Sequence, residues 1–199
     1  LLDDDHLLDE ILGLIEFPNV LIGSIDEQFM NLPKEVLTTA MRVHQKYFSI
    51  IDNKNNLVPK FLFVSNTIPE KERDKRVIEG NERVLKARLS DSNFFWKTDT
   101  SITIKILNEK LKNVQFYEGL GSLYEKTIRL SKVSKYFSSL FNVDESLAKE
   151  ASLLSKFDLV SEMVGEFPEL QGIMGSYFTK LDGKSKEVSN AIFEQYKPK

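Results

Sequence analysis

Residues 46–66, KYFSIIDNKNNLVPKFLFVSN, constrain the fold of this chain more than any other stretch. Two apolar runs, 47–51 and 57–64, are separated by DNKNN, whose residues favour a turn. This pattern predicts a β-hairpin. Beyond Pro69 no comparable strand pattern recurs, so the sheet is expected to lie before this proline.

The segments before the hairpin complete a small mixed module. Apolar residues between positions 7 and 15 follow the spacing of one helical stripe, which a proline then ends. NVLIGSID, residues 19–26, is short and β-branched and is predicted to be a strand. LPKEVLTTAMRVHQ is predicted to be a helix with Pro33 in its first turn, where the missing N–H has no cost. Together these segments predict an α+β module over residues 18–68.

The chain beyond Pro69 is predicted to be helical. EKERDKRVIEGNERVLKARL, residues 70–89, has the charge and spacing of a surface helix. SDSNFFWK is expected to begin another helix, with Ser90 or Asp91 as its cap. The buried edge of the charged helix is expected to comprise Val77, Ile78, Val84, Leu85 and Leu89.

Further helices are expected near residues 101–112, 122–141, 144–164, 168–180 and 184–196. The fold class is therefore predicted to be α+β, with an α+β region over residues 1–99 and an all-α region over residues 100–199.

The stretch NERVLKARLSDSNFFW joins basic side chains to Phe94, Phe95 and Trp96. Neighbours on a helix point about 100° apart, so these three aromatic rings cannot share one base-stacking surface. One or two of them are expected to pack into the core where the two halves of the chain join.

Composition excludes several classes of protein. The chain has no cysteine and its only histidines are His6 and His44, which excludes disulfides, Cys-ligated zinc and sites built on several histidines. No apolar run approaches the roughly 18 residues of a membrane span, and no signal peptide is visible. Because the chain has no cysteine, a protein of the reducing cytoplasm is expected. Because the sequence begins at Leu1 rather than Met, we expect an excised part of a longer chain.

Charge is segregated along the sequence. Residues 1–33 carry 8 acidic residues and no Lys or Arg, whereas residues 34–135 carry 20 basic and 12 acidic residues. A basic middle third inside an acidic protein is a weak signal for a polyanionic partner, and a solvated surface is the simpler interpretation.

Candidates for catalysis are poor. His44 has no cysteine or serine elbow to serve and is interpreted as a polar residue at a helix end. EGLGS, residues 118–122, precedes a helix but lacks the rest of a phosphate loop, so it is interpreted as a turn between helices. Asp158 lies among apolar residues and needs a partner, which Lys156, Lys126 or Arg129 could supply.

Six blocks carry a resemblance to a known family: HQKYF, LVPKFLFVSN, VIEGNERVLKARLSDSNFFWKTD, LGSLYEKTIRL, SLLSKFDLVSEMVGEFPELQGIMGSYF and EQYKP. In this order and spacing they resemble the bacterial glycyl-tRNA synthetase beta subunit, over roughly residues 7 to 198. The resemblance implies an internal part of that subunit: the end of its N-terminal α+β region, then the start of a helical domain similar to the HD phosphohydrolases.

The resemblance also implies a division of labour. In that family glycine and ATP, with magnesium, are handled by a separate alpha subunit, whereas the beta subunit binds tRNA(Gly) and holds the assembly together. No catalytic, cofactor or metal residue is therefore expected in this segment. At the position matching the His-Asp pair of HD enzymes this chain has Phe157 and Asp158. Because phenylalanine cannot ligate a metal, a metal-dependent phosphohydrolase is the weakest alternative.

Two functions remain open. The segment could contact tRNA directly, or it could be purely a protein–protein assembly segment that docks the alpha subunit. For direct contact, the candidate phosphate-binding residues are Arg83, Lys86, Arg88, Lys97, Lys126, Arg129 and Lys132.

Overall fold

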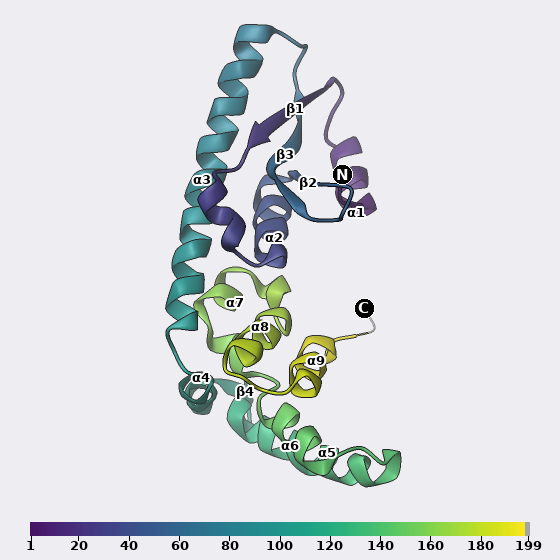
Figure 1. The fold of residues 1–199 in the computed structure, drawn as a ribbon, viewed down its shortest axis with the longest axis vertical. Helices are drawn as coiled ribbons and strands as arrows, with labels where there is room; N and C mark the ends of the chain where they lie inside the picture. Colours follow the sequence, from purple (N-terminus) through teal and green to yellow (C-terminus); the bar gives the residue numbers. More distant parts are fainter. Residues whose placement is uncertain (198–199) are drawn as a thin grey trace. The chain divides into compact units, whose positions relative to one another are not determined.

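The structure is a computed structural model that describes residues 1–197. It divides into two compact units, of which unit 1 is Leu1–Phe94 and unit 2 begins at Phe95 (Figure 1). The division falls inside helix α3 (Lys71–Thr100), a few residues before the boundary expected from composition. Pro198 and Lys199, the last two residues of the expected all-α region, lie outside the described residues.

Unit 1 contains an antiparallel sheet with the strand order β1-β3-β2. The strands are β1 (Pro18–Ser24), β2 (Phe48–Ile51) and β3 (Leu57–Asn66). The predicted hairpin is confirmed as β2 and β3, with Phe48 opposite Leu62. The strand predicted over residues 19–26 is confirmed as β1, which alternates between exposed and buried residues.

Helices pack on both faces of the sheet. Helix α1 (Asp5–Leu12) packs Leu7 and Ile11 against Phe48 of β2 on one face. The opposite face carries the rings of Phe61 and Phe63, which pack with Tyr47. Figure 1 shows α3 on the side of the sheet away from α1. Helix α2 (Lys34–Gln45) and the short η1 (Glu27–Asn31) complete the unit; the helix predicted at α2 is confirmed.

Helix α3 runs without a break, so the predicted cap at Ser90 or Asp91 is wrong. A serine can remain inside a helix when its hydroxyl donates to the carbonyl one turn earlier. Ser90 donates to Lys86 and Ser92 donates to Arg88 in this way. Of the predicted buried edge, Leu85 and Leu89 are fully buried, whereas Val84 is 46% exposed and was wrongly included.

Unit 2 begins with the end of α3 and contains a second, very small sheet. After α4 (Ile104–Lys110) and η2 (Leu111–Asn113), strands β4 (Gln115–Tyr117) and β5 (Gly121–Ser122) form a hairpin. The prediction of an all-α second half is therefore wrong at this point. EGLGS is part of this hairpin rather than a turn between helices: residues 118–120 form its turn, residues 121–122 form β5, and Gly119 and Gly121 adopt positive φ.

The rest of unit 2 is helical but more broken than predicted. Helix α5 (Leu123–Phe141) confirms one prediction, whereas the single helix expected over residues 144–164 is three elements. The following elements are α6 (Glu145–Leu153), η3 (Phe157–Val160), α7 (Glu162–Glu166), η4 (Pro168–Leu170), α8 (Ile173–Leu181) and α9 (Lys186–Glu194).

The three consecutive aromatic residues of α3 have different environments. Phe94 is 65% exposed, while Phe95 and Trp96 are partly buried. The Trp96 ring stacks on Phe178 of α8, with ring centroids 5.9 Å apart, and meets the edge of Tyr177. Trp96 thus belongs to the packing of unit 2.

Among residues 1–197, no helix is both long enough and apolar enough to cross a lipid bilayer.

Candidate functional site

The predicted phosphate-binding residues fall on two helices. Arg83, Lys86 and Arg88 lie on the unit 1 part of α3, and Lys97 lies in the last turn of that helix, within unit 2. The other three, Lys126, Arg129 and Lys132, lie on α5 in unit 2.

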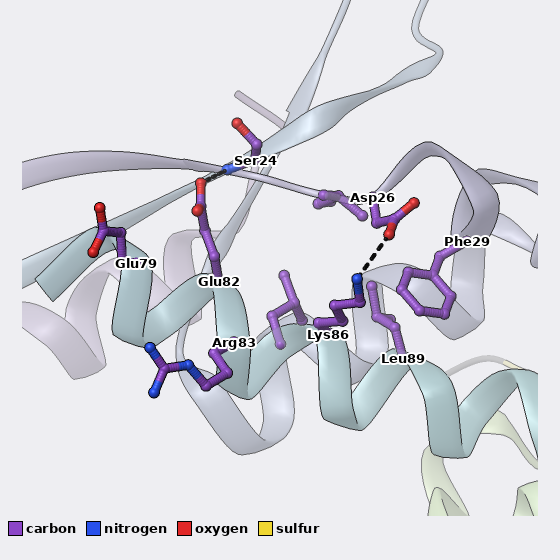
Figure 2. A pocket seen from close by; sticks show the side chains of 10 residues that line it. Ser24, Asp26, Phe29, Glu79, Glu82, Arg83, Lys86 and Leu89 are labelled. Atoms are coloured by element: carbon purple, nitrogen blue, oxygen red, sulfur yellow. Dashed lines mark hydrogen bonds and ion pairs between the residues drawn. The ribbon is translucent and has the colours of Figure 1, made fainter. Parts of the chain in front are cut away.

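Two of the α3 candidates, Arg83 and Lys86, line an open pocket of about 570 Å³ between α3, the end of β1 and η1 (Figure 2). Lys86 Nζ lies 3.1 Å from Asp26 Oδ2, and this contact lowers the pKa of the Asp26 carboxyl, with further help from the Gln28 amide. Glu82 accepts a hydrogen bond of 2.7 Å from the backbone N–H of Ser24. Acidic and basic side chains are therefore interleaved around this pocket.

This arrangement does not place the α3 candidates on one phosphate-binding face. The guanidinium of Arg83 points away from the Lys86–Asp26 pair in Figure 2. At about 100° per residue, Arg88 projects from nearly the opposite side of the helix to Lys86. Lys86 would also have to leave Asp26 to meet a phosphate.

The α5 candidates are arranged differently. Helix α5 begins with a capping box, in which the Ser122 hydroxyl accepts from the Glu125 N–H and the Glu125 carboxylate accepts from the Ser122 N–H. Lys126, Arg129 and Lys132 then follow at intervals of three residues, within an arc of about 120°. We call these three residues the α5 basic row. Arg129 and Lys132 are exposed, and Lys126 Nζ lies 3.9 Å from the centroid of the Phe116 ring.

A further lysine reinforces the positive charge near this row. Lys156 Nζ donates to Gln195 Oε1 and to the Tyr196 hydroxyl, each at 2.7 Å, and lies over the Tyr196 ring. Burial, with a smaller contribution from repulsion by Lys126, lowers the pKa of Lys156 to about 8. Lys156 thus lies close enough to both Lys126 and Asp158 for their charges to act on its pKa, the first lowering it and the second raising it.

This lowered pKa predicts a pH dependence of the stability of unit 2. Between pH 8 and 10.5 the unfolded chain holds the Lys156 proton more tightly than the folded chain, so the unfolding free energy should rise with pH in this range. Lys156→Met should flatten the rise between pH 7.5 and 9.5. The measurement is urea unfolding followed by fluorescence of Trp96, the only tryptophan and a residue of unit 2.

Exposed Lys149 offers a matched control, because Lys149→Met leaves Lys156 in place and should keep the slope of the parent chain. An unchanged slope in Lys156→Met would show that Lys156 titrates normally.

Asp158 is fully buried, but none of the cations proposed from sequence is its hydrogen-bonding partner. Its Oδ2 accepts the backbone N–H groups of Gly172 and Gly175 at 2.6 and 3.1 Å. Gly172 is the N-cap residue of α8 and has no side chain to cap it, so Asp158 serves as the cap from a distant position. Burial raises the pKa of this carboxyl, although the two amides and Lys156 act in the opposite direction.

Phe157, which the resemblance aligns with the histidine of an HD pair, is fully buried and packs against Phe178. In the described part of the chain, no three His, Asp or Glu side chains come together as a group that could hold a metal ion.

Asp99 is a buried residue that sequence reasoning missed. Its two carboxylate oxygens each accept a backbone N–H at 2.9 Å, from Glu162 and Met163 in the first turn of α7. Burial raises the pKa of Asp99, while these two hydrogen bonds lower it. No local signal marks this role, because the amides that Asp99 accepts lie 63 and 64 positions further along the chain.

The comparisons with known proteins agree with one another. The family model described as glycyl-tRNA synthetase beta subunit matches residues 1–199. The chain is similar to the glycine–tRNA ligase beta subunit of Rickettsia bellii, with 49% identity over 196 residues, which are 98% of this chain and 29% of that protein. It is 45% identical to the Pseudomonas syringae pv. tomato protein of that name over 193 residues, 97% of this chain and 28% of that protein. The chain thus spans less than a third of the length of these relatives.

Proposed function

Because the chain belongs to the glycyl-tRNA synthetase beta subunit family, we propose that it is part of the beta subunit of a heterotetrameric glycyl-tRNA synthetase. It supports the ATP-dependent attachment of glycine to tRNA(Gly) by binding tRNA and the alpha subunit. The catalytic centre, with its ATP and magnesium, belongs to the alpha subunit. The helical part of unit 2 has an HD-like fold in which Phe157 stands in place of the histidine of the catalytic pair and only the aspartate, Asp158, is kept.

The α5 basic row is the observation that carries the proposal of tRNA contact. Its three cations share one side of a helix, and two of them, Arg129 and Lys132, are exposed. Phosphates of an RNA backbone are spaced several ångströms apart, so a row of cations on one helix can meet several of them. In contrast, Lys86 of the α3 group is already paired with Asp26.

The role of Asp158 supports the proposal of a noncatalytic unit. Its Oδ2 is occupied by two backbone amides of α8, and its side chain has no contact with solvent. A carboxylate held in this way contributes to the stability of the helix rather than to a reaction centre.

Neutralising the α5 basic row tests the proposal. In the assembled synthetase, the triple substitution Lys126→Gln, Arg129→Gln and Lys132→Gln should weaken tRNA(Gly) binding, because each phosphate contact releases counterions. Log affinity decreases with log salt concentration, and this dependence should become shallower by about 2 to 3 in slope, since each lost phosphate contact contributes about 0.7 to 0.9. Fluorescence anisotropy of labelled tRNA over a salt series measures both quantities.

The matched control removes the same charge elsewhere. Lys54, Lys71 and Lys75 are exposed residues of unit 1, and their replacement by Gln should leave the salt slope unchanged. Equal slopes for the two triple variants would refute contact through α5, and the α3 group Arg83, Lys86 and Arg88 would be tested next. If the α5 triple variant lost its binding to the alpha subunit but bound tRNA as the parent does, the pure assembly role would be favoured.

A further inference from the structure

The C-terminal half of helix α5 carries its apolar residues on the side that faces solvent. After the basic row, the exposed apolar side chains of the helix are Val133, Tyr136, Phe137, Leu140 and Phe141, which we call the α5 apolar face. Their exposed fractions range from 46% for Phe137 to 71% for Phe141. The ring of Phe137 stacks on Phe141 and meets Tyr136 edge to face. Val143, just beyond the helix, is 55% exposed and extends the face.

The opposite side of α5 is polar, although it is the buried side. Thr127, Ser131 and Ser138 are buried, and Ser134 shares a hydrogen bond with Ser152 of α6, the helix that packs against α5. A surface helix ordinarily turns its apolar stripe to the core and its polar side to water. The C-terminal half of α5 has the reverse pattern, so burial within unit 2 does not explain the α5 apolar face.

The composition of the face favours a protein surface over RNA as the occupant. Aromatic side chains can stack on bases, but Val133, Leu140 and Val143 cannot. Aliphatic and aromatic residues at intervals of three and four along a helix match the packing of one helix against another apolar protein surface. Contiguous exposed apolar patches of this kind mark interaction sites in soluble proteins.

The length of the relatives indicates where this protein surface comes from. The chain covers 29% of the Rickettsia bellii beta subunit and 28% of the Pseudomonas syringae one, so more than two thirds of each polypeptide lies outside the matched segment. We propose that the α5 apolar face packs against an apolar surface of this remaining part of the same polypeptide in the full-length subunit. This inference does not require the α5 basic row to bind tRNA.

Thiol labelling of the full-length beta subunit tests the proposal. The segment has no cysteine, so Leu140→Cys introduces a single thiol into the face, and Ser139→Cys introduces one about 100° around the helix at an exposed site. Peptide-resolved mass spectrometry follows the maleimide reaction of each thiol. In the free subunit, Cys at 140 should react at least about 10-fold more slowly than Cys at 139, because it reacts only when the contact opens.

Each other outcome overturns the proposal. Rapid labelling at 140 in the free subunit with protection only after the alpha subunit is added would assign the face to that subunit. Protection only with tRNA would assign it to RNA, and protection that increases with protein concentration would assign it to a second copy. Rapid labelling under all conditions would mean that the face is not an interface. Phe141→Cys repeats the measurement at a second position, in case Leu140→Cys disturbs the helix.

Discussion

Replacing Asp158 by alanine should lower the unfolding free energy of unit 2 by about 2–4 kcal/mol, because the substitution leaves two buried amides without an acceptor and opens a small void. The amides are those of Gly172 and Gly175, at the start of α8. Urea unfolding followed by Trp96 fluorescence measures the loss, since Trp96 stacks on Phe178 of the same helix. We expect the transition to move to lower urea concentration with little change in its slope.

Asp158→Asn is the informative control. The amide oxygen of asparagine can accept the same two N–H groups, and its loss of charge removes the desolvation that raises the Asp158 pKa. We therefore expect Asp158→Asn to be close to the parent chain in stability near neutral pH. If both variants lost the same stability, the negative charge rather than the hydrogen bonds would hold α8.

The two variants should also differ in their pH dependence. Burial holds the pKa of Asp158 in the folded chain above its ordinary value of 3.8, so the folded state holds this proton more tightly than the unfolded state. The contribution of this carboxyl to stability is therefore greatest below pH 3.8 and is lost as the pH rises through the folded pKa. Asp158→Asn should not show this loss.

Replacing Gly23 by alanine should destabilise unit 1 by about 2 kcal/mol, because the added Cβ overpacks the sheet face. A Cβ at Gly23 would lie 2.4 Å from Cζ of Phe61, its neighbour on β3. The Phe61 ring is fully buried and stacks on Tyr47, with centroids 4.6 Å apart, so it has little room to move. Hydrogen exchange of the β1 and β3 amides, resolved by mass spectrometry, measures the change within unit 1.

Gly80→Ala provides the opposite case within the same unit. Gly80 lies inside α3, and an added Cβ would meet no atom within 4 Å. Alanine is preferred over glycine inside a helix by about 1 kcal/mol, so this substitution should stabilise unit 1. A stabilising effect of both substitutions would show that Phe61 can yield to the new methyl group.

Features that depend on neighbouring residues could be predicted from the sequence. The hairpin of β2 and β3 has its turn residues between two apolar runs, and the break between α5 and α6 has Asn142 in the left-handed conformation and Asp144 as the next cap. In both places the residues that predict the feature lie within a few positions of the feature itself. A local signal was misleading at Ser90. Serine is a good capping residue, but Ser90 lies inside a continuous helix because its hydroxyl donates to the carbonyl one turn earlier.

Features that depend on distant parts of the chain could not be predicted in this way. The sequence shows that Asp158 needs a partner, but charge alone suggested lysine or arginine, whereas the partners are backbone amides that no residue type reveals. The sequence also supplied the candidate phosphate-binding residues but not the charges that lie next to each of them. Composition places Lys86 and Lys126 in one basic region, yet only the fold shows that Lys86 is paired with Asp26 while Lys126 lies beside Lys156.

The cap that Asp99 supplies to α7 has a consequence for the order of folding. Helix α7 is only five residues long, and such a short helix does not persist alone in water. Two of its first amides find their acceptors 63 and 64 residues earlier in the chain, so their hydrogen bonds close a large loop. Closing a loop of this size costs entropy before any contact repays it. We therefore expect α7 to form late, after the end of α3 and the helices between them have come together.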